Sequence, residues 1–183
     1  MRRTLVSLMC HPEREPKIEL PPGDAYVQFL NKTPNYAQAY RDGMAKAVEG
    51  GMDLVTADTD GYHPPAEIVK LATGDFGEGP VLVLPYRENI GVQSKAFSML
   101  FSLLEGNRIR DSTGGLCRLS LELMKGLPTL RSSDMTIHIE ILKLALKSKA
   151  RIVQYGYLSE VNDEAGSRRT SHYQLKLLAA ILR

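Results

Sequence analysis

Two aspartates stand one residue apart at the end of an apolar run. Asp58 and Asp60 follow Met52–Ala57, a segment of strand length. Side chains two residues apart in an extended segment point the same way, so both carboxylates can converge on one point. Two such carboxylates repel unless they share a cation, and Mg²⁺ or Mn²⁺ typically binds one or two carboxylates with phosphate oxygens and water. An ordinary polar turn or helix N-cap is the alternative interpretation, because the backbone alone favours aspartate there.

Three further polar clusters could carry chemistry. Arg87 follows another strand-like run, where it could pair with phosphate or simply be solvated at the surface. Residues 108–115, RIRDSTGG, make a polar loop between two apolar helices, which suits either ligand contact or a turn with glycine caps. Residues 162–169 could form a mobile lid that brings Arg168 and Arg169 over an anion, although a solvated loop is the default.

Strand-length apolar runs alternate with stretches of helical period, and this alternation positions the clusters. The predicted strands are Thr4–Met9, Ala25–Leu30, Met52–Ala57, Pro80–Leu84 and Ala150–Tyr157. The predicted helices are Tyr36–Glu49, Glu67–Thr73, Val92–Glu105, Ser120–Lys125, Thr136–Lys149 and Tyr173–Arg183. This order predicts an α/β fold whose mainly parallel sheet carries helices on both faces. In such sheets ligands bind at the carboxyl ends of the strands, where Asp58 and Asp60 fall.

Composition narrows the class of protein. The chain has 183 residues, is 43% hydrophobic, and carries 23 basic against 21 acidic side chains, for a net charge of +2. That length suits a single domain over 1–183, and the charge is too small to indicate a nucleic-acid partner. Two distant cysteines predict neither a disulfide framework nor a zinc cluster. With no membrane-spanning apolar run and no signal-peptide cleavage site, we expect a cytoplasmic protein.

Several motifs in order resemble a known family. The residues are YRDGM (40–44), DLVTADTDGYHPPAEIVKLA (53–72), VLVLPYR (81–87), RDSTGGLCRLSLELMKGL (110–127), IHIEILKLALKSKARIVQYGY (137–157) and EAGSRR (164–169). Over about residues 31–172 they are similar to inverting glycosyltransferases of the GT-A fold, family 2, and most of all to the dolichyl- or polyprenyl-phosphate mannose or glucose synthases. Two features depart from the family pattern. The strand ending in Asp-Asp-x-Ser is missing, so we expect one βα unit to be deleted and the Rossmann-like fold to be truncated at its N-terminus. The hydrophobic C-terminal helices of some relatives are also missing, so we expect any membrane contact to be peripheral.

The resemblance implies an activity. A hexose would pass, with inversion, from a nucleoside-diphosphate sugar such as GDP-mannose or a UDP-hexose to an acceptor, with polyprenyl phosphate at a membrane surface expected. Asp58 and Asp60 would hold Mg²⁺ or Mn²⁺ as metal ligands and catalytic residues. Arg87, Arg110, Ser112, Arg168 and Arg169 would bind substrate.

Two points stay open at the level of sequence. An alcohol acceptor would need a carboxylate base, and Asp111 or Asp134 is the candidate for it. The alternative function is a non-catalytic sugar-nucleotide-binding or scaffold protein derived from such an enzyme, because the missing βα unit would otherwise help to hold the nucleotide. The sugar, the base and the oligomeric state are not specified by the sequence.

Overall fold

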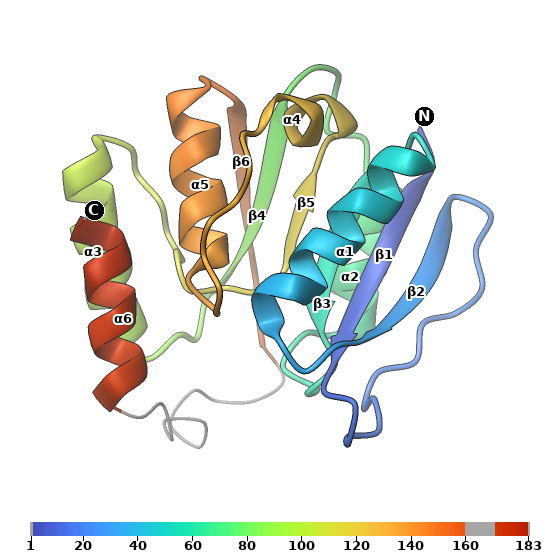
Figure 1. Cartoon of the computed structure of the whole chain (residues 1–183), viewed down its shortest axis with the longest axis horizontal. Helices are drawn as coiled ribbons and strands as arrows, with labels where there is room; N and C mark the ends of the chain where they lie inside the picture. The colour runs from blue at the N-terminus through green and yellow to red at the C-terminus, as the bar shows by residue number, and fades with distance from the viewer. Residues whose placement is uncertain (1, 160–170, 183) are drawn as a thin grey trace.

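The computed structural model describes residues 2–159 and 171–182. Its strands are β1 (Thr4–Cys10), β2 (Tyr26–Lys32), β3 (Asp53–Asp58), β4 (Val81–Arg87), β5 (Cys117–Leu119) and β6 (Arg151–Tyr157). Its helices are α1 (Tyr36–Glu49), α2 (Pro65–Thr73), α3 (Val92–Glu105), α4 (Leu121–Gly126), α5 (Ile137–Lys147) and α6 (Ser171–Leu182). Figure 1 shows them as one layered α/β body.

One sheet with the order β2-β1-β3-β5-β4-β6 organises the molecule. β1 pairs in parallel with β2 and β3, β4 pairs in parallel with β6, and β5 runs antiparallel between β3 and β4. All strands except β5 therefore end at the same edge, as the mainly parallel prediction requires. The short β5 corrects the sequence analysis, which expected only a polar loop between two helices in that region.

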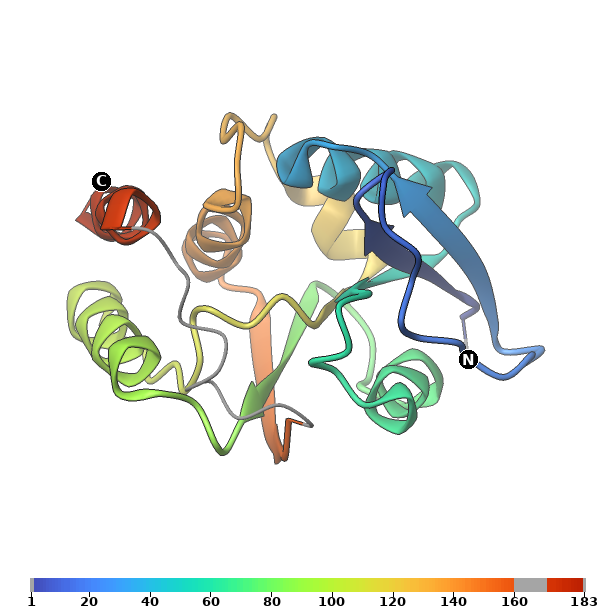
Figure 2. The ribbon, with the colours of Figure 1, turned by 90° about the horizontal axis from the view of Figure 1, so that it is seen from below.

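Helices cover both faces of the sheet. Figures 1 and 2 show α1, α4 and α5 on one face and α2 on the other. The alternation of side chains along β1 explains the two cores: Leu5 and Met9 join the cluster under α1, α4 and α5, whereas Val6 and Leu8 join the cluster under α2. α3 and α6 stand together beyond α5, at one end of the molecule (Figure 1).

The connection between β1 and β2 is unusual for parallel strands. Parallel strands need a crossover of a dozen residues or more, which is usually a helix. Here residues 11–25 contain four prolines and form neither helix nor strand. Ile18 and Leu20 from this crossover are buried in the α2-side cluster. The irregular segment thus does part of the covering that a helix would do, in agreement with the shortened N-terminal region predicted from the sequence.

Candidate functional site

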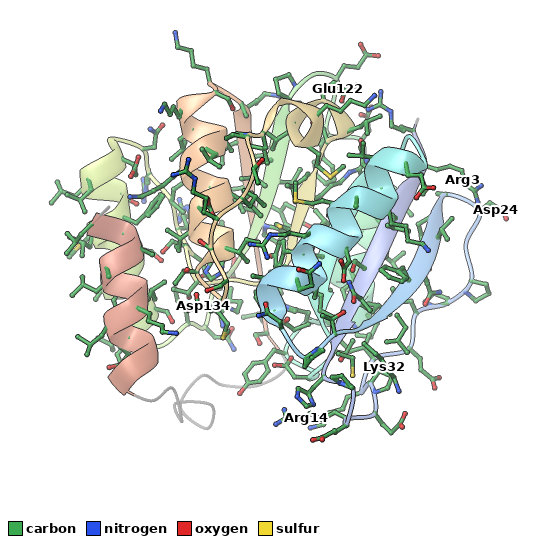
Figure 3. All side chains as sticks on the ribbon, viewed as in Figure 1. Arg3, Arg14, Asp24, Lys32, Glu122 and Asp134 are labelled. Carbon is green, nitrogen blue, oxygen red and sulfur yellow. The ribbon has the colours of Figure 1, made fainter. Side chains whose placement is uncertain are left out.

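A cavity of about 560 Å³ opens at the edge where β1, β2 and β3 end. We call it the main cavity. Its walls come from the ends of these strands, from the 11–25 crossover and from the start of α1. The lining residues used below are His11, Arg14, Glu15, Lys17, Tyr36, Asp58 and Asp60. Figure 3 labels Arg14, Lys32 and Asp134 near this edge of the molecule, with Arg3 and Glu122 near the opposite edge.

A second cavity, of about 200 Å³, adjoins the first. This inner cavity shares Tyr36, Asp58 and Asp60 with the main cavity, and adds His63, Arg87, Thr113 and Gly115. Asp58 and Asp60 therefore lie where the two hollows meet. The structure brings together the two carboxylates on which the metal prediction depends and exposes them to both spaces.

The backbone after β3 is fixed so that these carboxylates reach the cavities. Thr59, between them, is buried and donates a hydrogen bond from its hydroxyl to the Met9 carbonyl at 3.1 Å. Its own carbonyl accepts a bond from the Lys17 amide at 3.0 Å. The intervening residue is thus tied to β1 and to the crossover, which leaves Asp58 and Asp60 on the cavity side.

Gly115 sets the wall opposite Asp58. A Cβ atom at this position would lie 2.5 Å from an Asp58 carboxylate oxygen and 3.0 Å from the Tyr36 hydroxyl. Only a glycine lets the 106–116 loop come this close to the carboxylate. The Gly115 carbonyl is held in turn by the hydroxyls of Tyr40 and Thr56, each at 3.2 Å. The loop is therefore held close to the Asp58 carboxylate.

The donor set suits a hard divalent cation that keeps open coordination positions. Among residues 2–159 and 171–182, no cluster of three or more His, Cys, Asp or Glu side chains forms a closed metal cage. Asp58 and Asp60 offer two carboxylates at a solvent-accessible cavity, and Mg²⁺ or Mn²⁺ commonly completes such a site with phosphate oxygens and water. The residues present thus fit an ion that is shared with a phosphate-bearing ligand.

Arg87 and Asp111 form a buried ion pair at the back of the inner cavity. The Arg87 guanidinium donates to Asp111 at 2.8 Å and 3.3 Å and to the Thr113 hydroxyl at 2.9 Å. Burial by itself would raise the pKa of Asp111, but Arg87 and the bonds from Thr113 hold that pKa below its usual value. Arg87 is therefore an oriented interior cation rather than the solvated surface arginine that the sequence also allowed.

This pairing argues against Asp111 as a general base. Its side chain is fully buried, it lines neither the main nor the inner cavity, and its ionised form is stabilised by Arg87. Asp134, the other candidate, lies next to the start of α5 and bonds to Lys176 at 2.9 Å. Although partial desolvation opposes it, bonds from Lys176 and Thr136 lower the pKa of Asp134 to about 2. Neither carboxylate is suited to removing a proton near neutral pH.

The remaining predicted substrate residues lie elsewhere. Ser112 is buried, and its hydroxyl lies 3.2 Å from that of Ser98 on α3, so it supports the loop instead of facing a ligand. Arg110 is exposed, stacks over Tyr86 and lines a third cavity of about 550 Å³ beside α3, the α3 cavity. Arg168 and Arg169 fall outside the described residues. Of the predicted residues, then, the structure gathers Asp58, Asp60 and Arg87 around one space.

His63 is a site residue that the sequence analysis missed. It is buried at the inner cavity, and its Nδ1 lies 2.8 Å from the Tyr157 hydroxyl at the end of β6. Burial first, and then the Arg87 charge, lower the pKa of His63 to about 4. The imidazole is therefore neutral at pH 7. The sequence offers only its nearness to Asp60 as a signal, because its partner Tyr157 is 94 residues away.

Comparisons with known proteins support the fold assignment. No protein-family model and no curated protein sequence matches the chain. Solved structures nevertheless confirm the predicted GT-A-like α/β fold. Among the similar structures are complexes of glucosyl-3-phosphoglycerate synthase from Mycobacterium tuberculosis. The complex with UDP has a TM-score of 0.64 and 18% identity, covering 99% of this chain and 79% of that one.

Two other complexes of the same synthase carry more of its ligands. The complex with Mn²⁺, UDP and phosphoglyceric acid has a TM-score of 0.64 and 16% identity, covering 99% of this chain and 78% of that one. The complex with Mn²⁺, UDP-glucose and phosphoglyceric acid has a TM-score of 0.61 and 18% identity, covering 99% and 79%. At these identities the likeness establishes the fold. The chemistry of this chain depends on the residues of its own site.

Proposed function

We propose that this protein is a metal-dependent hexosyltransferase that uses a nucleoside-diphosphate sugar. The observation that carries the proposal is the placement of Asp58 and Asp60 together, at the carboxyl edge of a GT-A-like sheet and at the junction of two cavities. The similar synthase binds UDP, UDP-glucose and Mn²⁺ in its crystal structures, which supports the same class of donor and ion here.

The donor would occupy the main cavity. Asp58 and Asp60 would hold the divalent cation, which when bound supplies positive charge to the departing diphosphate. Arg14, Glu15 and Lys17 on the crossover line the same cavity. With a divalent cation on Asp58 and Asp60, the two basic side chains would give the lining a net positive charge, which favours an anionic ligand. Gly115 leaves the space that the Asp58 carboxylate occupies.

In the reaction the bond between the anomeric carbon and the diphosphate oxygen breaks, and an acceptor oxygen bonds to the opposite face of that carbon. The nucleoside diphosphate leaves with the electron pair of the broken bond. Arg87 would add a fixed positive charge at the inner cavity, because Asp111 and Thr113 keep its guanidinium oriented. His63 would remain neutral beside it and would add no competing charge.

A phosphate monoester is the acceptor that this site suits. Such a group is already mostly ionised at neutral pH, so its oxygen needs no strong base, and the structure provides none at Asp111 or Asp134. The resemblance in sequence suggests a polyprenyl phosphate. The similar synthase is crystallised with phosphoglyceric acid, which also carries a phosphate. We therefore propose that the acceptor carries a phosphate monoester, the group that both molecules share. The assay identifies which molecule bears this group.

The test is a turnover assay with UDP- and GDP-sugars, Mn²⁺, and three acceptors: phosphoglyceric acid, glycerol 3-phosphate and a short polyprenyl phosphate. We expect nucleotide release and a glycosylated product with one acceptor, and a loss of about 100-fold or more in Asp60→Asn. Asp24→Asn, which changes an exposed aspartate on the crossover, is the matched control and should keep full turnover.

Two results would argue against the proposal. Equal metal-dependent turnover in Asp60→Asn and the parent would remove the acidic pair from the mechanism. Nucleotide binding that is never followed by sugar transfer, across the whole panel, would favour the non-catalytic binding protein instead.

A further inference from the structure

The outer side of α3 and α6 carries two apolar stripes. α3 exposes Val92, Ala96, Met99 and Leu103, and α6 exposes Leu175, Ala179 and Leu182. Spacings of three and four residues place the members of each set on one side of their helix. We call the combined surface the two-helix face. Its stripes lie opposite the buried residues of the same helices, such as Phe101 on α3 and Leu177 on α6.

The two stripes belong to one surface because the helices lie side by side. Figures 1 and 2 show α3 and α6 adjacent at the end of the molecule beyond α5. The Gln174 side chain, early in α6, donates a hydrogen bond to the Gln93 side chain, early in α3, at 2.9 Å. The helices therefore run in the same direction with their first turns together. Leu104, half exposed, adds to the apolar area of α3.

The face is too large to be a scatter of surface residues. Six large apolar side chains on it are between 50% and 83% exposed: Val92, Met99, Leu103, Leu104, Leu175 and Leu182. At roughly 100 Å² each, they present about 600 Å² of apolar surface, the upper end of what a typical monomer shows. The largest apolar patch of a monomer is often a functional surface.

The charges around the face indicate its partner. The stripes themselves contain no charged residue. Lys95 lies on α3, beside its apolar stripe. It lines the α3 cavity together with Arg108, Arg110 and Glu88, and these four side chains carry a net positive charge. On the other flank, beside α5, Lys176 bonds to Asp134. The α3 flank thus carries a net positive charge, whereas Asp134 compensates the charge of Lys176 on the α6 flank.

This arrangement disfavours a second copy of the chain as the partner. In the two-fold arrangement that sets α3 against α3, two positively charged flanks would meet, and like charges repel. An anionic surface would instead pair with the positively charged α3 flank. Lysine side chains can also lie along apolar surface while their ammonium groups reach a polar headgroup layer.

We propose that the two-helix face docks on a lipid bilayer that carries anionic headgroups. The apolar stripes would enter the boundary between headgroups and acyl chains, and the flanking basic residues would contact lipid phosphates. No helix in the described part of the chain is long and apolar enough to span a membrane, so the contact is interfacial. This inference stands on the helices alone and does not depend on the proposed transferase activity.

The test is co-sedimentation of the full chain with vesicles of phosphatidylcholine alone or with added phosphatidylglycerol. We expect binding to the anionic vesicles that weakens with salt and falls tenfold or more in Met99→Gln/Leu103→Gln, whose changes are on an exposed face. Leu30→Gln is the control, because Leu30 is 43% exposed on β2, away from the face. It should bind like the parent.

Three outcomes would overturn the proposal. The first is no binding to either vesicle. The second is equal binding by the double variant and the parent. The third is a concentration-dependent dimer, seen by sedimentation velocity without vesicles and abolished in the double variant, which would assign the face to a second copy of the chain. Circular dichroism of each variant confirms that its fold is intact.

Discussion

At the scale of single residues, the inner cavity has a charged side chain that its hydrogen-bond partners hold in one position. Arg87 is buried with its counter-ion Asp111, so its charge stays in one place, and the hydroxyl of Thr113 fixes the guanidinium further. His63, beside this pair and bonded to Tyr157, is kept neutral by burial and by the Arg87 charge. The neutral imidazole adds no charge, so the charged side chains that line the inner cavity are Arg87, Asp58 and Asp60, and an anionic ligand is favoured once a divalent cation is bound to the two carboxylates.

The depressed pKa of His63 predicts a pH dependence of stability. The unfolded chain binds a proton at His63 below about pH 6.5, whereas the folded chain does so only below a pKa of about 4. Between these values the unfolded state binds more protons, so the free energy of unfolding falls as pH is lowered. From pH 7 to pH 5 we expect a loss of about 2 kcal/mol from this group. Urea denaturation at both pH values measures it.

Two variants isolate the contribution of His63. His63→Gln should show a smaller loss of stability between pH 7 and pH 5 than the parent, because its side chain does not titrate. Leu30→Gln, which changes a partly exposed side chain that does not titrate, should keep the slope of the parent. Identical slopes in the parent and His63→Gln would show that His63 is not held neutral in the folded protein.

At the scale of elements, the site depends on how closely the 106–116 loop approaches the end of β3. Tyr40 on α1 and Thr56 on β3 both hold the Gly115 carbonyl, and Thr56 also lies 3.2 Å from the Cys117 sulfur on β5. The loop leads directly into β5, and the antiparallel pairing of β5 with β3 and β4 fixes this end of the loop. The close approach at Asp58 is therefore a property of three packed elements.

Adding one methyl group at Gly115 tests that approach. In Gly115→Ala the new Cβ would lie 2.5 Å from an Asp58 carboxylate oxygen, so the carboxylate must move. We expect Mn²⁺ affinity in the presence of UDP or GDP, measured by titration calorimetry, to fall by about 10- to 100-fold. Gly126→Ala is the matched control, because a Cβ there meets no atom within 4 Å. Equal affinities in both variants would contradict the role of the loop.

Elements with a strong periodic signal were predictable from the sequence. α1 and α3 have the predicted bounds, because each has an apolar period and a polar or glycine boundary at both ends. β5 was not predictable: three residues are too few to show a strand pattern, and its pairing with β3 and β4 is entirely long-range. β4 extends through Pro85 to Arg87, because parallel pairing with β6 overrides the weak local preference.

The candidate site was predictable only in part, for a similar reason. Asp58 and Asp60 are close in sequence and follow a strand, so local reasoning places them at the sheet edge. The partners of Arg87 are 24 and 26 residues away, and His63 meets Tyr157 across 94 residues. No spacing rule connects such pairs. Whether a polar residue faces a cavity or pairs in the interior is decided by the packing of separate elements, as Ser112 and Asp111 show.

At the scale of the whole molecule, the two edges of the sheet have different roles. At the edge away from the cavities, Arg118 on β5 pairs with Asp53 at 2.8 Å and donates to the carbonyls of Leu71 and Gly74. Asp53 also accepts the Leu121 amide at 2.9 Å. These bonds join β3, β5, α2 and α4 at that edge, whereas the cavity edge is built from loops and an irregular crossover. Ligand binding should therefore stabilise the less regular edge.

Coupling between ligand and fold can be measured as thermal stability. A ligand that binds only the folded state stabilises it by about 2.7 kcal/mol at 100 times its dissociation constant. For a chain of this size we expect a rise in melting temperature of roughly 5–10 °C with Mn²⁺ and the preferred nucleotide diphosphate together. Without Mn²⁺ the rise should be much smaller, because Asp58 and Asp60 would repel the diphosphate.

In Asp60→Asn the gain from adding Mn²⁺ should vanish, whereas Asp24→Asn should retain it. A rise of the same size with and without the metal would mean that the nucleotide binds independently of the acidic pair, and the main cavity would then hold it through His11, Arg14 and Lys17 alone.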